Sequence, residues 1–204
     1  MVERWTRERR MEHTRALLID AAEATFAAKG FVAATLGDIA DVAGYTKGAI
    51  YAHFDTKESL FLAVSDRYWR RYFDNFTDVL STVTHIGDAE IDEIAARWRH
   101  ISESGGAQHA ALGHEFTLYL LRNPEALERV AERRLQVLAA LTTFVIEGVA
   151  RLGATLSIPA ETFAQLLIST SDGVMLGSQL TDLDLYRPAL QMYMSVIEMP
   201  PSSA

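Results

Sequence analysis

The segment 30–60 constrains the fold of this chain more than any other, because it contains the signals for consecutive short helices. Thr35 and Asp38 stand three residues apart, which is the spacing of a capping box at a helix start. Gly44 follows the apolar pattern of that helix and is the type of residue that ends one. Thr46 is placed to cap the next helix. The segment therefore predicts a helix, a tight turn and a second helix.

The second of these helices carries a small apolar face beside a polar one. Ile50 and Phe54 are four residues apart, so they share a face and can pack into a core. The other faces carry hydrogen-bond donors and a glycine, at Lys47, Gly48, Tyr51 and His53. Such a surface suits a helix that enters the major groove of DNA. Thr56 predicts the start of a third helix, where Lys57 and the helix dipole would both face a phosphate.

Over roughly residues 11–62 the chain resembles the DNA-binding domain of TetR/AcrR-type transcriptional repressors. The match is carried by Gly30, Phe31, Thr35, Ile39, Ala40, Ala43, Gly44, Lys47, Gly48, Tyr51, Phe54, Lys57, Glu58 and Leu60. With that resemblance, the expected DNA-binding residues are Thr35, Tyr45, Thr46, Lys47, Gly48, Tyr51, His53 and Lys57. The resemblance also implies that residues 1–56 read a double-stranded operator, while residues 57–204 bind a small-molecule effector and form a homodimer.

The net charge of −8 argues against binding to nucleic acid by bulk attraction, but the charge is unevenly distributed. Residues 1–60 contain eight basic and nine acidic residues, so this part carries −1 and the remainder carries −7. The acidity therefore lies mostly in the second domain. The nearly neutral N-terminal part, which we call the reading head, is still compatible with DNA binding through few ionic contacts. Its charge predicts that the affinity for DNA depends only modestly on salt concentration.

Composition narrows the class of protein further. The 204 residues are 49% hydrophobic and include no cysteine, which excludes a disulfide framework and a thiolate metal site. No apolar run approaches the ~18 residues of a membrane span. The N-terminal residues lack the apolar stretch of a signal peptide. We expect a cytoplasmic protein with no membrane segment.

The rest of the chain shows helical periodicity and no alternating strand pattern, which predicts an all-α fold of about nine helices. We call the segment 30–60 the reading segment. A first helix before it is expected at about 12–29, ended by Gly30. Asn123 is the expected cap of a helix that begins at Pro124. The later helices are expected at about 57–80, 88–101, 108–122, 124–153, 163–180 and 186–198.

We hypothesise that the aromatic residues of the second domain line a cavity that binds an effector, although packing in a core is the default for such residues. The candidates are Trp69, Tyr72, Phe73, Phe76, Trp98, Phe116 and Tyr119. Polar residues within or beside the apolar stripes favour a cavity, because a buried polar atom needs a partner. These are His100, His114, Thr142, Ser171 and Asp172, of which Thr142 and Asp172 are the strongest candidates. The pattern favours an apolar or aromatic effector.

The last two helices combine apolar and small residues, as a core or a dimer interface would. The resemblance implies that they form a four-helix bundle across a two-fold axis. Catalysis is the competing function, but the sequence contains no nucleophile, phosphate-loop or metal-binding motif. We therefore expect no catalytic residues, metal or cofactor. An architectural DNA-binding protein without an effector, and less favourably a helical enzyme, remain as alternatives.

Overall fold

The structure is a computed structural model that describes residues 6–82 and 87–199, without the side chains of residues 72, 73 and 75–82. The described residues are almost entirely helical, so the all-α prediction is confirmed. The chain divides into two compact units. Unit 1 contains residues 1–71 and 112–130, and unit 2 contains residues 72–111 and 131–204. The functional division at residue 56 stays a prediction.

Helix α1 (Arg7–Ala33) is the first element of unit 1. It begins earlier than predicted, because the Thr6 side chain caps it by accepting the Arg9 N–H at 3.2 Å. The predicted stop at Gly30 is confirmed, since Gly30 breaks the helical backbone with a φ of 75° and a ψ of 168°. Three further residues make a short turn before α2.

The predicted helix, turn and helix are present as α2 (Leu36–Ala43) and α3 (Lys47–Tyr51). The Thr35 hydroxyl accepts the Asp38 N–H at 3.1 Å, and the Asp38 carboxylate accepts the Thr35 N–H at 3.0 Å. This reciprocal pair confirms the capping box. Gly44 ends α2 with a φ of 69° in the left-handed region. The Thr46 side chain then caps α3 by accepting the Ala49 N–H at 3.3 Å.

The core of unit 1 joins the reading segment to three further helices. These are the start of α4 (Lys57–Thr82), the end of α6 (Ala107–Arg122) and the start of α7 (Pro124–Arg151). The Phe31 ring lies 5.1 Å from that of Phe61 and 4.8 Å from that of Phe116, measured between centroids. Burying such rings is a large stabilising contribution, and their edge-to-face geometry adds to it.

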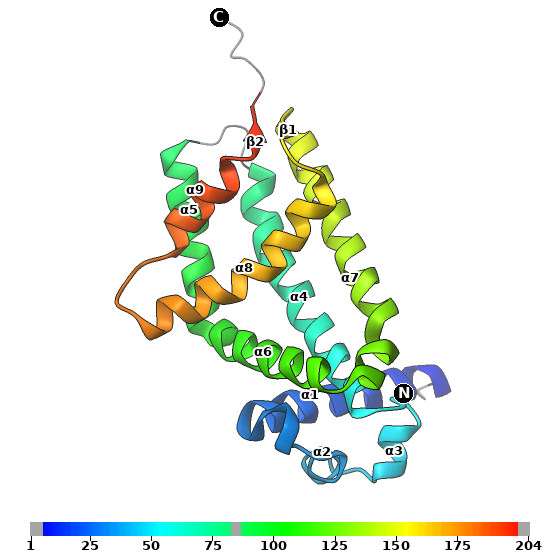
Figure 1. Ribbon diagram of the computed structural model, residues 1–204. Coiled ribbons are helices and arrows are strands. Elements are labelled where there is room, and N and C mark those ends of the chain that lie inside the picture. The colour runs from blue at the N-terminus through cyan, green and yellow to red at the C-terminus, as the bar shows by residue number, and fades with distance from the viewer. Residues whose placement is uncertain (1–5, 83–86, 200–204) are drawn as a thin grey trace, which may run out of the picture. The chain divides into compact units, whose positions relative to one another are not determined.

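Unit 2 has its own apolar core, built from α5 (Asp88–Ile101), α8 (Ala160–Leu180), α9 (Tyr186–Met194) and the second part of α7. Helix α9 packs against both α5 and α8 (Figure 1). The indole of Trp98 contacts the rings of Tyr186 and Tyr193, at 5.4 and 6.1 Å between centroids. Helices α4, α6 and α7 each contribute residues to both units.

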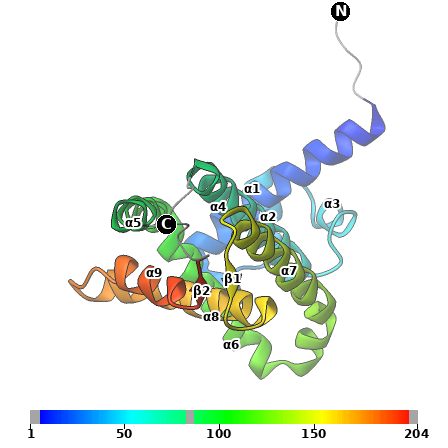
Figure 2. The same cartoon turned by 90° about the horizontal axis from the view of Figure 1, so that it is seen from above.

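Three details of unit 2 differ from the sequence prediction. Beyond the predicted end of α5 the chain continues into a short π-helical segment, η1 (Ser102–Gly106), whose helical backbone is broken at Ser104 and at Gly105, where φ is 106°. The last helix ends at Met194, and the chain then forms the strand β2 (Ile197–Glu198). This strand pairs antiparallel with β1 (Thr155–Leu156), so the expectation of no strand was wrong for these two short segments (Figure 2). Strands of two residues are too short to show the alternation of apolar and polar residues by which a strand is recognised in a sequence.

Asn123 stands before a helix that begins at Pro124, as predicted, and its carbonyl oxygen accepts the Leu127 N–H at 3.1 Å, but its side chain does not cap that helix. The Asn123 side-chain amide donates to the carbonyl oxygen of Tyr119 at 2.7 Å, so it satisfies the end of α6 rather than the start of α7. An asparagine side chain can both donate and accept, and sequence alone does not say which of the two adjoining helix ends it serves.

No helix within the described residues is long and apolar enough to cross a membrane.

Candidate functional site

The candidate nucleic-acid surface is the outer face of α3 together with the turn before it. Ile50 is fully buried and Phe54 is 5% exposed, and these two side chains fix α3 on the core of unit 1. Tyr51 is 57% exposed and Tyr45 is 37% exposed. Thr46, Lys47 and Gly48 are also exposed, and His53 is half-buried. Helix α3 and the turn before it therefore present most of the predicted donors to solvent, whereas His53 follows the helix and is half-buried.

Gly48 is not required by the packing of the chain. A Cβ atom at Gly48 would meet only the Thr46 hydroxyl oxygen, at an ordinary contact distance of 3.6 Å. Glycine in a helix costs about 1 kcal/mol relative to alanine. The fold alone therefore gives no reason for a glycine here, whereas the close approach of another molecule to the backbone would.

Thr35 is exposed, but its hydroxyl is used within the chain. It donates to the Asp38 carboxylate at 2.9 Å and accepts the Asp38 N–H. The Lys29 ammonium lies 2.8 Å from the same carboxylate. That hydrogen bond, followed by the backbone and hydroxyl of Thr35, lowers the pKa of Asp38 to about 2. The start of α2 is thus held by a charged capping group.

Lys57 has a different environment from the one that the sequence predicted. Its ammonium donates to the carbonyl oxygens of Phe31, Val32 and Ala34 at 2.9, 3.2 and 3.0 Å. It also lies 4.5 Å from the centroid of the Phe31 ring, a cation–π distance. Burial lowers the pKa of Lys57 from its ordinary value. These bonds tie the start of α4 to the end of α1, and the contact of Lys57 with a phosphate stays a prediction.

The same end of α1 is held from the other side by Glu115 of α6. The Glu115 carboxylate accepts the backbone N–H groups of Phe31 and Val32 at 3.0 and 2.8 Å. A Cβ atom at Gly30 would stand 2.6 Å from this carboxylate. The glycine therefore serves two purposes, because it permits the positive φ and leaves room for Glu115.

A buried carboxylate, that of Glu58, links α4 to α6 and α7. Glu58 is 6% exposed and accepts the Tyr119 hydroxyl at 2.6 Å and an Arg129 N–H at 3.3 Å. Burial raises the pKa of Glu58, but the hydrogen bonds from Tyr119 and the backbone and the charge of Arg129 outweigh it, so its pKa is lowered overall. We call Lys57, Glu58, Glu115, Tyr119 and Arg129 the head brace.

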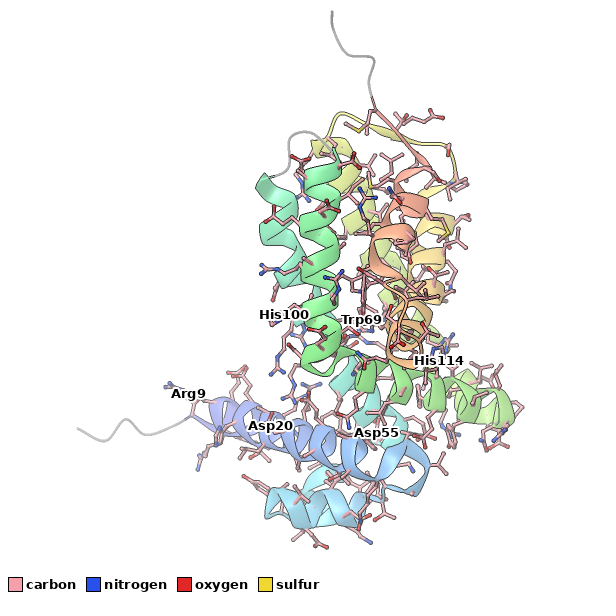
Figure 3. All side chains as sticks on the ribbon, turned by 90° about the vertical axis from the view of Figure 1, so that its left-hand side faces the viewer. Arg9, Asp20, Asp55, Trp69, His100 and His114 are labelled. Carbon is pink, nitrogen blue, oxygen red and sulfur yellow. The ribbon has the colours of Figure 1, made fainter. Side chains whose placement is uncertain are left out.

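The effector candidates are divided between the two units. Trp69, Phe116 and Tyr119 belong to unit 1. Phe116 is 5% exposed and packs in the aromatic core, while Tyr119 belongs to the head brace. Trp69 is half-buried, and Figure 3 labels it on α4. The side chains of Tyr72, Phe73 and Phe76 lie outside the described residues.

Unit 2 holds the remaining candidates, Trp98, Thr142 and Asp172. Trp98 is 2% exposed. The half-buried Thr142 hydroxyl donates to the Leu138 carbonyl oxygen at 2.8 Å, so it has a partner within its own helix. Asp172 is half-buried on α8. Whether any of the nine candidates contacts an effector stays a prediction.

The polar residues expected beside the apolar stripes have mixed positions. His100 and His114 are exposed within the chain, on α5 and α6 (Figure 3), so neither supplies a buried polar group. Ser171 is 7% exposed, as the pattern suggested. Sequence reasoning missed Ser102, which is 2% exposed. In the described part of the chain, no three histidine or acidic side chains are grouped so as to hold a metal ion.

The last two helices are not equivalent in their exposure. Helix α9 turns Tyr186, Ala189 and Tyr193 into the core of unit 2. Helix α8 keeps an outer stripe, in which Leu166 is 46% and Leu180 is 84% exposed. The other exposed residues at this helical spacing are Thr162, Ser169 and Gly173. A Cβ atom at Gly173 would meet nothing within 4 Å.

Comparison with known proteins gives strong matches to the reading segment. The family model described as "Bacterial regulatory proteins, tetR family" matches residues 18–64. The HTH-type transcriptional regulator TtgR of Pseudomonas putida is 50% identical over 63 residues, which are 31% of this chain and 30% of that protein. The HTH-type transcriptional repressor KstR2 of Rhodococcus jostii is 35% identical over 65 residues, 32% of each protein. The match thus spans less than a third of either relative.

The likeness to solved structures extends over nearly the whole chain. The structure of a SmeT–triclosan complex superposes with a TM-score of 0.55 and covers 93% of each chain, at 23% sequence identity. At that identity the likeness concerns the fold alone. The sequence match therefore describes the reading segment, and the structural match describes the helical arrangement of the rest.

Proposed function

We propose that this chain is a TetR/AcrR-type regulator, and that it acts as a ligand-responsive repressor that binds a palindromic DNA operator as a homodimer. The observation that carries the proposal is the exposed face of α3, where donors surround a glycine that the fold does not need. Two such heads would occupy successive major grooves, with half-sites about one helical turn apart. The proposal places the protein in the cytoplasm, where the chromosome is accessible.

The proposed roles of the DNA-binding residues follow from their positions. Tyr51 and Lys47 are exposed donors that can reach bases or phosphates, and Gly48 permits close approach of the backbone. The flanking contacts are assigned to Thr35, Tyr45, Thr46 and His53. Lys57 is assigned to the head brace, because its ammonium already donates to three carbonyl oxygens. Its role is then to set the orientation of α1 against α4.

The proposed dimer uses the last two helices unequally. The apolar face of α9 is already buried in unit 2, so the outer stripe of α8 would supply most of the apolar contact. Close approach of two copies of α8 at Gly173 suits this arrangement, because no side chain stands in the way. A dimer of this kind presents two identical reading heads.

Coupling between effector and operator is proposed to run through the head brace. Helices α4, α6 and α7 contribute residues to both units, and all three supply residues of the brace. An effector that favours a different conformation of α6 would shift Glu115 and Tyr119, and with them the ends of α1 and α4. Such coupling must be reciprocal, so operator binding weakens effector binding by the same factor.

The DNA-binding proposal is tested by selecting operator fragments from genomic DNA with the purified full-length chain, followed by mobility-shift titration. Tyr51→Ala and Gly48→Ala should each weaken operator binding by about 5- to 150-fold, the equivalent of about 1–3 kcal/mol. Both variants should fold, and Gly48→Ala should be slightly more stable. The control is Leu121→Ala, which removes a side chain that is 69% exposed on α6. Unchanged affinity in both α3 variants would exclude this surface.

The dimer proposal is tested in the full chain by sedimentation at micromolar concentration. Leu166→Lys should shift the protein toward the monomer, because a charge would be buried in the apolar contact. Leu121→Lys places the same charge on a leucine of α6 that is 69% exposed, against 46% for Leu166, and should leave the dimer intact. Dimers in both variants would move the interface away from the stripe of α8.

An architectural DNA-binding protein without an effector remains the second candidate. The two functions are distinguished by whether any small molecule changes operator affinity in a saturable way. A regulator, unlike an architectural protein, requires such a ligand and the reciprocal effect of DNA on its binding. An enzymatic role would instead require turnover of that ligand, which the proposed function does not include.

A further inference from the structure

Three buried hydrogen-bonding groups of unit 2 have no partner within the described chain. They are the indole Nε1 of Trp98 and the hydroxyl oxygens of Ser102 and Ser171, which we call the donor cluster. Trp98 and Ser102 are each 2% exposed, and Ser171 is 7% exposed. Most buried polar groups in proteins are hydrogen-bonded, and an unpaired one costs about 1–3 kcal/mol. Three such groups in one unit therefore indicate a binding partner.

The three residues belong to one region of the fold. Trp98 and Ser102 are four residues apart across the junction of α5 and η1, so they lie on the same helical face. The Trp98 ring contacts that of Tyr193, whose hydroxyl lies 2.6 Å from the hydroxyl of Thr170, the neighbour of Ser171. Tyr193 thus links the tryptophan to the turn of α8 that carries Ser171.

The η1 segment explains why a serine is buried here. The backbone stays helical at Ser102 and is broken only at Ser104 and Gly105, so Ser102 keeps the face of α5 that carries Trp98, and it is 2% exposed. A loop at this position would allow the hydroxyl to bond with water.

The chemistry of the cluster selects the chemistry of a ligand. An indole N–H can only donate, and a serine hydroxyl can donate as well as accept. A ligand that satisfies all three must present acceptor oxygen or nitrogen atoms. The rest of the surroundings are apolar, with Phe163 at 6% and Met175 at 0% exposed in the same core. Most of the ligand must therefore be apolar as well.

The charges of unit 2 disfavour an anionic ligand at this place. Arg99 pairs with Asp184, and Arg187 pairs with Asp88 and Asp92 at 2.8 and 2.6 Å. Burial lowers the pKa of His109 to about 4, so this side chain of the same unit is neutral at pH 7. A carboxylate bound at the cluster would lose its hydration without gaining a counter-charge from these residues.

We propose that the donor cluster is the polar subsite of the effector and that the effector is a neutral, mainly apolar molecule with a carbonyl or similar acceptor group. The inference rests on the proposed ligand-responsive function and adds the class of ligand and the residues that select it. The sequence already pointed to Trp98 and Ser171, and the structure adds Ser102 and the unpaired hydrogen-bonding atoms of all three. The subsite belongs to unit 2, and the reading surface belongs to unit 1.

The first test measures the thermal stability of the ligand-free full-length protein. Ser102→Ala and Ser171→Ala should each raise Tm by about 2–4 °C, because each removes a buried hydroxyl that has no partner. The control is Ser169→Ala on α8, whose hydroxyl already donates to the Gln165 carbonyl oxygen at 2.8 Å and is exposed. A lower Tm in both buried-serine variants would show that the hydroxyls are satisfied in the free protein, and would overturn the proposal.

The second test uses three matched probes, namely benzophenone, diphenylmethane and diphenylacetate. Binding is followed by quenching of tryptophan fluorescence in the wild type and in the two serine variants. The ketone should bind at least about tenfold more tightly than the hydrocarbon and the carboxylate, and the serine variants should lose most of this preference. No preference for the ketone, including no binding of any probe, would overturn the proposal.

A third measurement separates this inference from the proposed function. Operator affinity is titrated with and without the ketone in the wild type and in Ser102→Ala. Ketone binding that leaves operator affinity unchanged would support the subsite and contradict the proposed coupling. Operator binding by a protein that fails the ketone test would support the DNA-binding role and overturn the subsite alone.

Discussion

The head brace of unit 1 and the donor cluster of unit 2 are both sets of polar groups with buried members, and they differ in how the chain satisfies them. In the brace Glu58 is buried, Lys57, Glu115 and Tyr119 are half-buried, and Arg129 is exposed. In the brace, Lys57 donates to three carbonyl oxygens, and the carboxylates of Glu58 and Glu115 each accept two hydrogen bonds. In the cluster, Trp98 Nε1 and the two serine hydroxyls have no partner within the described residues.

This difference explains how one chain can combine a rigid region, the head brace, with a region that responds to a ligand, the donor cluster. A fully satisfied polar network stabilises one arrangement of its helices, because any other arrangement leaves charges or carbonyl groups unpaired. An unsatisfied set favours whichever conformation or ligand supplies the missing bonds. We therefore expect substitutions in the brace to reduce stability, and the serine substitutions of the cluster to increase it.

The largest expected effect is the loss of the Lys57 ammonium. Lys57→Met should lower the free energy of unfolding by about 3 kcal/mol, because partly buried carbonyl oxygens lose a charged donor. Urea unfolding followed by circular dichroism measures this. Lys47→Met is the matched control, since Lys47 is exposed on α3, and it should change stability by no more than about 0.5 kcal/mol.

Lys57→Met should have the larger effect on stability, whereas Lys47→Met should have the larger direct effect on operator affinity. Lys47→Met should weaken operator affinity, whereas Lys57→Met should do so only to the extent that it unfolds the head. Equal stability of the two variants, together with a larger loss of operator affinity in Lys57→Met, would instead assign Lys57 to a phosphate. The pair therefore decides between the bracing role and the contact expected from the sequence.

The next effect concerns the turn that the brace surrounds. Gly30→Ala should destabilise the protein by about 2 kcal/mol, because a φ of 75° with a ψ of 168° is essentially restricted to glycine. A new Cβ atom would also displace the Glu115 carboxylate, which lies 2.6 Å from its position. Thermal unfolding measures the loss.

Gly44→Ala is the control for that substitution. Gly44 has a φ of 69° and a ψ of 28°, and nothing lies within 4 Å of its Cβ position. Only the strain of a left-handed residue remains, which costs about 1 kcal/mol. If both substitutions cost the same, the close approach of Glu115 contributes nothing to the energy of the turn.

The sequence predicted those parts of the reading head that depend on near neighbours. Thr35 and Asp38 are three residues apart, so their capping box can be recognised without knowledge of the fold. Gly44 signals its own backbone conformation through its residue type. The apolar spacing of Ile50 and Phe54 likewise predicted which side of α3 is buried.

The brace could not be predicted in this way, because its bonds join residues that are distant in the chain. Glu115 binds the Phe31 N–H across 84 residues, and Tyr119 binds Glu58 across 61. Ser102 was missed for another reason. The predicted helix ends at about residue 101, because SESGG has the composition of a loop, whereas the helical backbone extends to Ser102 and this serine is buried.

A smaller effect compares one tyrosine hydroxyl in each unit. Tyr119→Phe should cost about 1.5 kcal/mol, because it removes a hydrogen bond of 2.6 Å to the Glu58 carboxylate. Tyr193→Phe in unit 2 removes a bond of the same length to the neutral Thr170 hydroxyl and should cost about 0.5–1 kcal/mol. Urea unfolding of both variants measures the difference. A larger loss for Tyr193→Phe would contradict the view that the brace is the more strongly bonded region.

The smallest expected effect is the response of the α2 cap to acid. Hydrogen bonds from Lys29 and from Thr35 lower the pKa of Asp38 from 3.8 to about 2. The folded state therefore binds this proton more weakly than the unfolded state. The stability that Asp38 contributes is fully present above its ordinary pKa and is lost as the pH falls from about 4 to about 2.

Asp38→Asn cannot titrate, so it isolates that contribution. The difference in unfolding free energy between wild type and Asp38→Asn should be constant above pH 5 and should shrink as the pH falls toward about 2. In a Lys29→Ala background the decline should begin at a higher pH, because the largest cause of the lowered pKa is removed. Urea unfolding across this pH range measures both series. A difference that persists unchanged at pH 2 would mean that the carboxylate does not hold the start of α2 by its charge, and the cap would then act through the Thr35 hydroxyl alone.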